Sequence, residues 1–297
     1  MQKSKYLGWP EYTLKRIITR FREDGVSGVF SAIRKRLAPR KPPQLRGFKG
    51  LLPLFRDKYG LEVGGPSAVF KADGLMPVYQ SAGRIDGCNF ANQTIWEGQI
   101  QEGMSYQVGK EVGYQFIAEA SELKMICSAK YDFLLASHCL EHVANPLGAL
   151  SEWLRVLKDG GILVLLLPDK SATFDHRRPV TAFSHLLQDL NKQTPEDDLT
   201  HLDEILALHN LEMDLLAGNK ESFEKRSRAN LSNRCLHHHV FDMALIKDVF
   251  QIFWIKYTPF ILGTALSLDS HWAKTTRSGL DTRQPAKITF KNYKVFC

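Results

Sequence analysis

The chain has 297 residues, of which 44% are hydrophobic and 24% are charged, the composition of an ordinary globular protein and not of a disordered one. No run of about 18 uncharged apolar residues occurs, and no apolar core of a secretory signal stands at the N-terminus, so neither a membrane span nor export is predicted. Five cysteines without a CxxC pair argue against a disulfide framework or a cysteine-based zinc site. We expect a cytoplasmic protein.

The net charge of +7 is concentrated in residues 1–50, which hold 13 Lys+Arg against 3 Asp+Glu. Apolar residues at helical spacing predict two basic amphipathic helices there, and Pro39, Pro42 and Pro43 predict a linker before the main domain, residues 51–297. Such helices either lie on an anionic membrane or cap the domain, so peripheral contact with the inner face of a membrane is one expectation. Because the main domain is slightly acidic, we expect no nucleic-acid partner.

From residue 59 onward, short apolar runs alternate with helical patterns, as in a parallel sheet with helices on both faces. The last predicted strand is apolar throughout, which indicates a strand covered on both sides. The sequence therefore predicts an α/β domain, with its clearest strands at residues 59–64, 131–137 and 162–167.

A helix is predicted between the last two of these strands, because Asn145 is a natural N-cap, Pro146 suits the first helical position, and Gly160 and Gly161 can end the helix. Residues 169–236 then interrupt the alternation with polar, histidine-rich sequence, which we interpret as a helical insertion after the fifth core strand. The remaining expected elements are a helix near 240–252, a strand near 253–262 and an edge hairpin.

Two motifs indicate a nucleotide-type site. In LEVGGPS, residues 61–67, a strand runs into glycines that let the backbone approach a ligand, and Glu62 near the strand's end can bind an amine or a hydroxyl. Asp86 follows at about the distance of the carboxylate that holds ribose hydroxyls in dinucleotide sites. An ordinary turn at either place is the alternative.

Further motifs follow in a characteristic order. Glu119-Ala120 precedes the strand that begins Tyr131-Asp132, and then come Leu140-Glu141-His142, Asn145-Pro146 and RVLKDGG at 155–161. Over residues 61–168 this order resembles class I S-adenosylmethionine-dependent methyltransferases of the broad type 11 group. The resemblance implies a Rossmann-like fold, S-adenosylmethionine as cofactor, and transfer of its methyl group to an acceptor.

The resemblance also implies roles for individual residues. One departure from the family pattern is that Pro66 and Ala68 stand where the family has further glycines. The implied cofactor-binding residues are Glu62, Gly64 and Gly65 in the loop, Asp86 on the ribose, Glu119 and Ala120 at the adenine, and Ser137 near the methyl group, which His138 also faces.

Beyond the core, TFDHRRP at 173–179 and RCLHHHVFD at 234–242 resemble segments of a bacterial subset associated with sugar or surface-polysaccharide pathways. This resemblance implies O-methylation of a sugar, glycan or related small molecule. His138 or His239 would accept the proton of the acceptor hydroxyl. The other candidate substrate-binding residues are His176, Arg177, Arg178 and His238, of which the arginines suit a phosphate or carboxylate.

Three alternatives stay open. Residues 138–142 (HCLEH) match the HxxEH motif of inverted zinc peptidases, although Pro146 leaves room for only about one helical turn. His138, Glu141 and His142 could instead bind a divalent ion, as similarly placed residues do in some ubiquinone-pathway and small-RNA methyltransferases, with a fourth ligand from the insertion. Finally, the altered turn at Pro66 could make the chain a catalytically silent scaffold. We assign no metal, since consecutive histidines at 237–239 cannot all face one ion.

Overall fold

The computed structural model describes residues 44–45, 47–214, 216–254, 260–265, 288–290 and 293–295. The amphipathic helices predicted near the N-terminus lie outside these residues. The compact unit that contains the sheet is Gln44–Cys297. Its packing begins before the predicted boundary at residue 51, because Phe48 is buried and stacks on Phe55 with ring centroids 6.2 Å apart.

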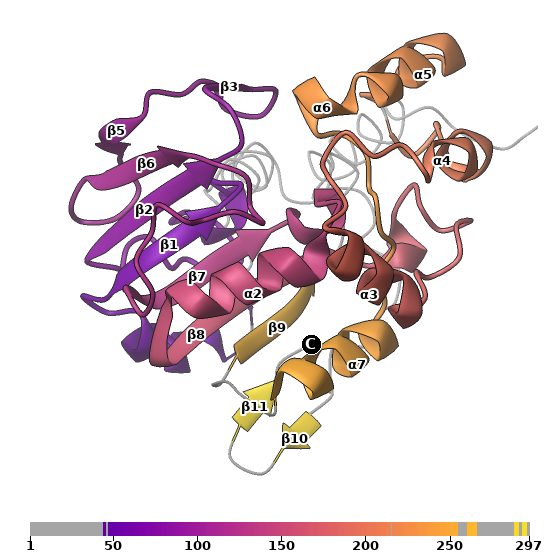
Figure 1. Ribbon diagram of the computed structural model, residues 1–297. Coiled ribbons are helices and arrows are strands. Elements are labelled where there is room, and N and C mark those ends of the chain that lie inside the picture. The colour runs from indigo at the N-terminus through magenta and orange to yellow at the C-terminus, as the bar shows by residue number, and fades with distance from the viewer. Residues whose placement is uncertain are drawn as a thin grey trace, which may run out of the picture. The chain divides into compact units, whose positions relative to one another are not determined.

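A seven-stranded sheet in the order β5-β6-β2-β1-β7-β8-β9 forms the centre of this unit (Figure 1). All neighbouring strands pair in parallel except β5 and β6, which are antiparallel. The chain starts at the middle of the sheet, moves to one edge and then returns to the other side of β1, which confirms the predicted Rossmann-like arrangement. The strands are β1 (Tyr59–Val63), β2 (Arg84–Asn89), β5 (Gly103–Tyr106), β6 (Gly113–Ile117), β7 (Tyr131–Ser137), β8 (Leu157–Pro168) and β9 (Phe260–Ala265).

Alternate residues of the central strands pack into two separate hydrophobic cores, one on each face of the sheet. In β7, Leu134 packs on one face of the sheet and Phe133 on the other. The face that contains Leu134 is covered by the α-helices α2 (Pro146–Val156), α3 (Phe183–Lys192) and α7 (Met243–Trp254). Among the described residues, the opposite face is covered by 3-10 turns at Phe48–Gly50, Leu52–Leu54 and Ala68–Phe70.

Helix α2 begins where the sequence predicts, because the Asn145 side chain accepts a hydrogen bond from the backbone of Gly148 at 3.0 Å. It ends at Val156, before the glycines that were predicted to end it. Gly160, at φ +75°, instead belongs to β8, where the register with β7 shifts. These glycines therefore shape the entry into a strand.

The predicted insertion is present between β8 and α7. It contains α3 and then α4 (Leu202–Leu208), α5 (Lys220–Arg228) and α6 (Asn230–Asn233), with α5 and α6 at the top of Figure 1. At the C-terminal end, β10 (Ile288–Phe290) pairs with β11 (Tyr293–Val295) in a separate sheet, whereas the sequence predicted an edge hairpin. A second small sheet pairs β3 (Gln93–Thr94) with β4 (Gly98–Gln99). None of the helices described is both long and apolar enough to span a membrane.

Candidate active site

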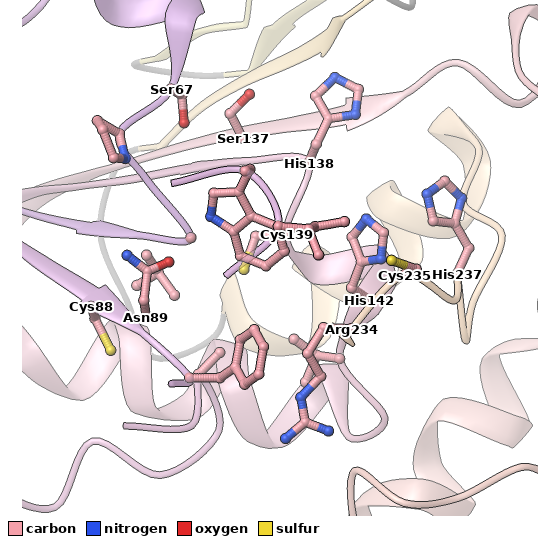
Figure 2. A pocket seen from close by; sticks show the side chains of 18 of the residues that line it. Ser67, Cys88, Asn89, Ser137, His138, Cys139, His142, Arg234, Cys235 and His237 are labelled. Carbon is pink, nitrogen blue, oxygen red and sulfur yellow. The ribbon is translucent and has the colours of Figure 1, made fainter. Parts of the chain in front are cut away.

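A cavity of about 530 Å³ opens at the carboxyl ends of β1, β2 and β7. Its volume lies in the range of small-molecule sites, and its wall comes from two parts of the chain that are distant in sequence (Figure 2). The sheet side includes Gly64, Asn89, Glu119, Ala120, Ser137 and His138, and the insertion side includes Glu196, Arg234 and His237.

The glycine turn after β1 leads the chain along the cavity. Gly64 lines it with φ +77°, a backbone conformation that favours glycine. Gly65 does not line the cavity, but a Cβ there would stand 2.2 Å from the carboxyl carbon of Glu62. Both glycines are thus required by geometry, one by its backbone angle and the other by lack of space.

Glu62 supports this turn from behind instead of facing the cavity. Its fully buried carboxylate accepts hydrogen bonds from the hydroxyls of Tyr79 and Tyr106, each at 2.6 Å, and from the backbone of Ser67 at 3.0 Å. Burial raises the pKa of Glu62, and these hydrogen bonds oppose the rise. This position does not support the implied direct contact of Glu62 with the cofactor, because Glu62 does not line the cavity and its carboxylate is held from behind the turn.

Asp86 lies in the middle of β2 and outside the cavity lining, so its position does not agree with the implied contact to ribose. Its buried carboxylate accepts hydrogen bonds from the hydroxyls of Tyr59 and Tyr131 and pairs with Lys130 at 3.2 Å. Burial raises its pKa, but these hydrogen bonds lower it below the ordinary value. Asp86 therefore joins neighbouring strands.

Asn89 takes the place at the cavity that the sequence assigned to Asp86. It ends β2, and its side-chain NH₂ donates to the carbonyl of Gly65 at 2.9 Å. Its buried Oδ1 has no hydrogen-bond partner among the described residues, although Asn89 lines the cavity. Because an unpaired buried acceptor is unfavourable, this oxygen suits a ligand hydroxyl. Sequence reasoning missed it by taking the first carboxylate at the expected spacing.

Glu119 and Ala120 line the cavity, as the resemblance implied. The Arg234 guanidinium donates to the Glu119 carboxylate, and it also packs over the ring of Phe90 at 4.9 Å. Burial raises the pKa of Glu119, and Arg234 opposes this rise. The guanidinium of Arg234, which belongs to the insertion, thus contacts both the Phe90 ring and the Glu119 carboxylate.

The opposite end of the cavity is rich in histidine, and Figure 2 shows His138, His142 and His237 on the side away from Asn89. His138 has φ +50°, an uncommon value for a residue with a Cβ and one that occurs often at functional sites. His142 Nδ1 lies 2.9 Å from the carbonyl of Leu236, and burial lowers its pKa to about 4, so its ring is neutral at pH 7.

Glu141 lies behind this histidine group. Both its carboxylate oxygens are buried without a hydrogen-bond partner among the described residues, and His138 Nδ1 stands 3.4 Å from one of them. Ligand atoms of Glu141, His142 and His237 all lie within 4.8 Å of one another. His237 lies where the divalent-ion alternative allows a ligand from the insertion, but His138, a ligand in that alternative, does not belong to this group. The peptidase alternative loses support, because Leu140–His142 is a 3-10 turn and this set of possible metal ligands lacks His138.

The arginine pair predicted to bind substrate lies away from the cavity lining, and so does His176. Arg178 is buried, where it pairs with Asp175 at 3.1 Å and with Glu204 at 2.8 Å. Arg177 is exposed, and the ring of His176 bonds locally within its own turn. The contacts of Arg178 are internal, so it joins parts of the insertion.

His238 and His239 also lie outside the cavity lining. The ring of His238 is 3.1 Å from the side chain of Asn230, and burial lowers its pKa to about 3. His239 Nε2 lies 3.2 Å from the carbonyl of Ala144, and both histidines are buried. The histidines that line the cavity are the predicted His138, together with His142 and His237, which sequence reasoning did not assign to the acceptor.

The sheet order, the glycine turn and the cavity at the strand ends define a Rossmann-like domain that binds a nucleotide-type ligand. A family model described as a methyltransferase domain matches residues 51–216, more than half of the chain. The chain belongs to this methyltransferase family, and its cofactor is S-adenosylmethionine. The unpartnered Asn89 oxygen and the open backbone at Gly64 are features that suit the binding of S-adenosylmethionine.

The solved structures to which the chain is similar are remote in sequence. A methyltransferase of Thermotoga maritima, titled a possible histamine N-methyltransferase, is 19% identical over 61% of this chain and 70% of its own, with a TM-score of 0.29. An arsenic(III) S-adenosylmethionine methyltransferase of Chlamydomonas reinhardtii is 16% identical over 36% and 37%, with a TM-score of 0.26. The chain spans less than half the length of several similar solved structures, from 37% to 48%. No curated protein matches the chain.

Proposed function

We propose that the protein transfers the methyl group of S-adenosylmethionine to a hydroxyl oxygen of a sugar, a glycan or a related small molecule. The observation that carries this proposal is the division of one cavity into two ends. One end has the glycine turn and the unpartnered Asn89 oxygen, and the other has the imidazoles of His138, His142 and His237. A nucleotide-type ligand suits the first end, and a hydroxyl that must lose a proton suits the second.

At the cofactor end, Asn89 Oδ1 accepts a hydrogen bond from a ribose hydroxyl. The glycine turn lets the backbone approach the cofactor closely at Gly64, while Glu62 holds the turn in place. Glu119 accepts from the adenine amino group, which requires that Arg234 share or release that carboxylate.

At the acceptor end, the cofactor supplies an electrophilic methyl group on its sulfonium sulfur. The acceptor oxygen forms a bond to the methyl carbon as the carbon–sulfur bond breaks, and the hydroxyl proton passes to a base. His142 suits this role, because its Nδ1 faces a carbonyl and leaves Nε2 free to accept. His138, which also lines the cavity, is the second candidate base.

The orphaned Glu141 carboxylate favours a metal-assisted version of the same reaction. A divalent ion held by Glu141, His142 and His237 would bind the acceptor hydroxyl and lower its pKa, so that no histidine needs to act as base. In this version a chelator abolishes turnover, and added divalent metal restores it. In the metal-free version turnover survives the chelator.

The test has two stages. Calorimetric titration with S-adenosylmethionine and S-adenosylhomocysteine should show micromolar binding. Incubation of the complex with nucleotide sugars and glycans, followed by mass spectrometry, should then show addition of one methyl group to an oxygen. A chain that fails to bind either ligand at millimolar concentration would be the silent scaffold.

A further inference from the structure

A second histidine cluster lies outside the cavity lining, and the proposed methyl transfer does not use it. His185 and Asp189 stand one turn apart on α3, His201 directly precedes α4, and His239 directly follows the two other histidines of its triplet. Because residues four apart on a helix share a face, His185 and Asp189 point the same way. The four residues thus come from three separate segments of the chain.

The side chains of this cluster converge on one point. His185 Nε2 and His201 Nε2 are 2.8 Å apart, and their rings are nearly perpendicular. The Asp189 Oδ2 atom lies 3.3 Å from His185 Nε2 and 3.7 Å from His239 Nε2. One ring nitrogen of each of the three histidines lies within 4.8 Å of the others.

Protein groups alone leave this cluster incompletely bonded. Asp189 Oδ1 accepts a hydrogen bond from Thr194 at 2.9 Å, but its buried Oδ2 has no hydrogen-bond partner among the described residues. His239 Nδ1 is likewise buried without a partner there, while its Nε2 lies 3.2 Å from the carbonyl of Ala144. Buried polar atoms are normally paired, so the unpaired Asp189 oxygen among these imidazoles indicates a missing ligand.

We propose that His185, Asp189, His201 and His239 bind one Zn²⁺ ion through three imidazole nitrogens and one carboxylate oxygen. Nitrogen and oxygen ligands of this kind are those that zinc prefers, and four protein ligands make a closed, structural site. The ion joins α3, the start of α4 and the segment at His239. That segment also carries His237, so the zinc site fixes the insertion side of the cavity without touching the acceptor.

The experiment measures metal content in the full chain, without an activity assay. Protein purified with zinc present is dialysed, and its metal is quantified by mass spectrometry. A second sample is treated with a chelator and loaded with Co²⁺. The absorption spectrum of the bound Co²⁺ then reports the coordination geometry of the site. The variants are His201→Ala and Asp189→Asn. The controls are His176→Ala, a histidine outside both clusters, and Glu141→Gln, which removes the orphaned carboxylate at the cavity.

We expect one zinc per wild-type chain, a tetrahedral Co²⁺ spectrum, and loss of both in His201→Ala and Asp189→Asn while circular dichroism remains that of a folded protein. His176→Ala and Glu141→Gln should keep the metal. If His201→Ala keeps its zinc and Glu141→Gln loses it, the ion belongs to the cavity and the proposal is overturned. Wild-type protein that takes up no zinc overturns it as well. If a variant does not fold, His185→Gln repeats the test at another ligand.

Discussion

Asn89 and Asp86 stand three positions apart on β2, but their side chains face different environments. The Asn89 oxygen is unpartnered at the cavity, whereas the Asp86 carboxylate is bonded to groups of neighbouring strands. We expect Asn89→Ala to weaken binding of S-adenosylhomocysteine about tenfold, the loss of one hydrogen bond to the ligand. It should also lower the free energy of unfolding by about 1 kcal/mol, because the hydrogen bond to the Gly65 carbonyl is lost. Calorimetry checks the affinity, and Asn92→Ala, at an exposed position, is the control.

Asp86→Asn should mainly lower stability and leave ligand affinity unchanged. The amide cannot accept from both tyrosine hydroxyls and Lys130 as a carboxylate does, so we expect a loss of about 2 to 4 kcal/mol in the free energy of unfolding. Affinity for S-adenosylhomocysteine should stay near that of the wild type in the folded protein. Urea denaturation measures the stability of this variant, and calorimetry measures its affinity for the ligand. Weaker binding by the folded variant would show that Asp86 contacts the ligand.

These two residues show what sequence reasoning could and could not place. Gly64 and His138 follow strands whose apolar pattern is visible in the sequence, and Ser137 ends one of these strands. Glu119, which also lines the cavity, was implied by the family resemblance. Asn89 was missed because the exact end of β2, which decides the residue that reaches the cavity, is not readable from spacing. The roles of the insertion histidines depend on long-range packing, which no local pattern specifies.

At the scale of elements, the turn after β1 has little tolerance for a side chain. A Cβ at Gly65 would overlap the Glu62 carboxyl carbon at 2.2 Å and the Tyr106 hydroxyl at 2.5 Å. We expect Gly65→Ala to lower the free energy of unfolding by about 1 to 3 kcal/mol and to weaken cofactor binding. Gly50→Ala is the matched control, because a Cβ there meets nothing within 4 Å. Equal effects of the two substitutions would contradict the packing argument.

The stability of the insertion is expected to depend on pH through Asp214. Burial raises the pKa of Asp214, but the nearby His209, whose Nε2 lies 3.2 Å from the carboxylate, and a hydrogen bond from Arg226 at 2.7 Å bring it down to about 2. A carboxylate with a lowered pKa contributes stability above its unfolded value of 3.8, here about 2 kcal/mol, and loses it as the pH falls from about 4 to 2. Asp214→Asn should therefore be less stable than the wild type at pH 6, with a difference that shrinks in acid.

Hydrogen exchange in α4 and α5, followed from pH 6 to pH 3, measures this effect directly. The exposed Asp203 on α4 provides the control variant Asp203→Asn. A stability difference for Asp214→Asn that does not change with pH would show that the interaction is not one between charges.

The elements themselves were largely predictable. Alternating or continuous apolar runs predicted β1, β7 and β8, and the N-cap and proline predicted the start of α2. The end of α2 was not predictable, since Gly160 and Gly161 suit a helix end and a strand entry equally well. The register shift between β7 and β8, which decides between them, is a property of the assembled sheet.

For the whole molecule, charge separates the two parts of the chain. Residues 1–50 carry 13 Lys+Arg against 3 Asp+Glu, in a pattern for which contact with anionic lipid is one of the two expectations given above. We expect the full chain to sediment with vesicles that contain phosphatidylglycerol at low salt and to be released at high salt. A chain that begins at Gln44 should stay in solution while it still binds S-adenosylhomocysteine. Binding of both forms to neutral vesicles would contradict an electrostatic contact.

The contact between Arg234 and Glu119 has a consequence for cofactor exchange. With adenine bound as proposed, the incoming amino group competes with a guanidinium that is part of the protein, so an internal competitor lowers the apparent affinity. The same competitor re-forms its ion pair when spent S-adenosylhomocysteine leaves. On this proposal Arg234 shortens the residence time of the product, because the ion pair that re-forms in the empty site favours the ligand-free state.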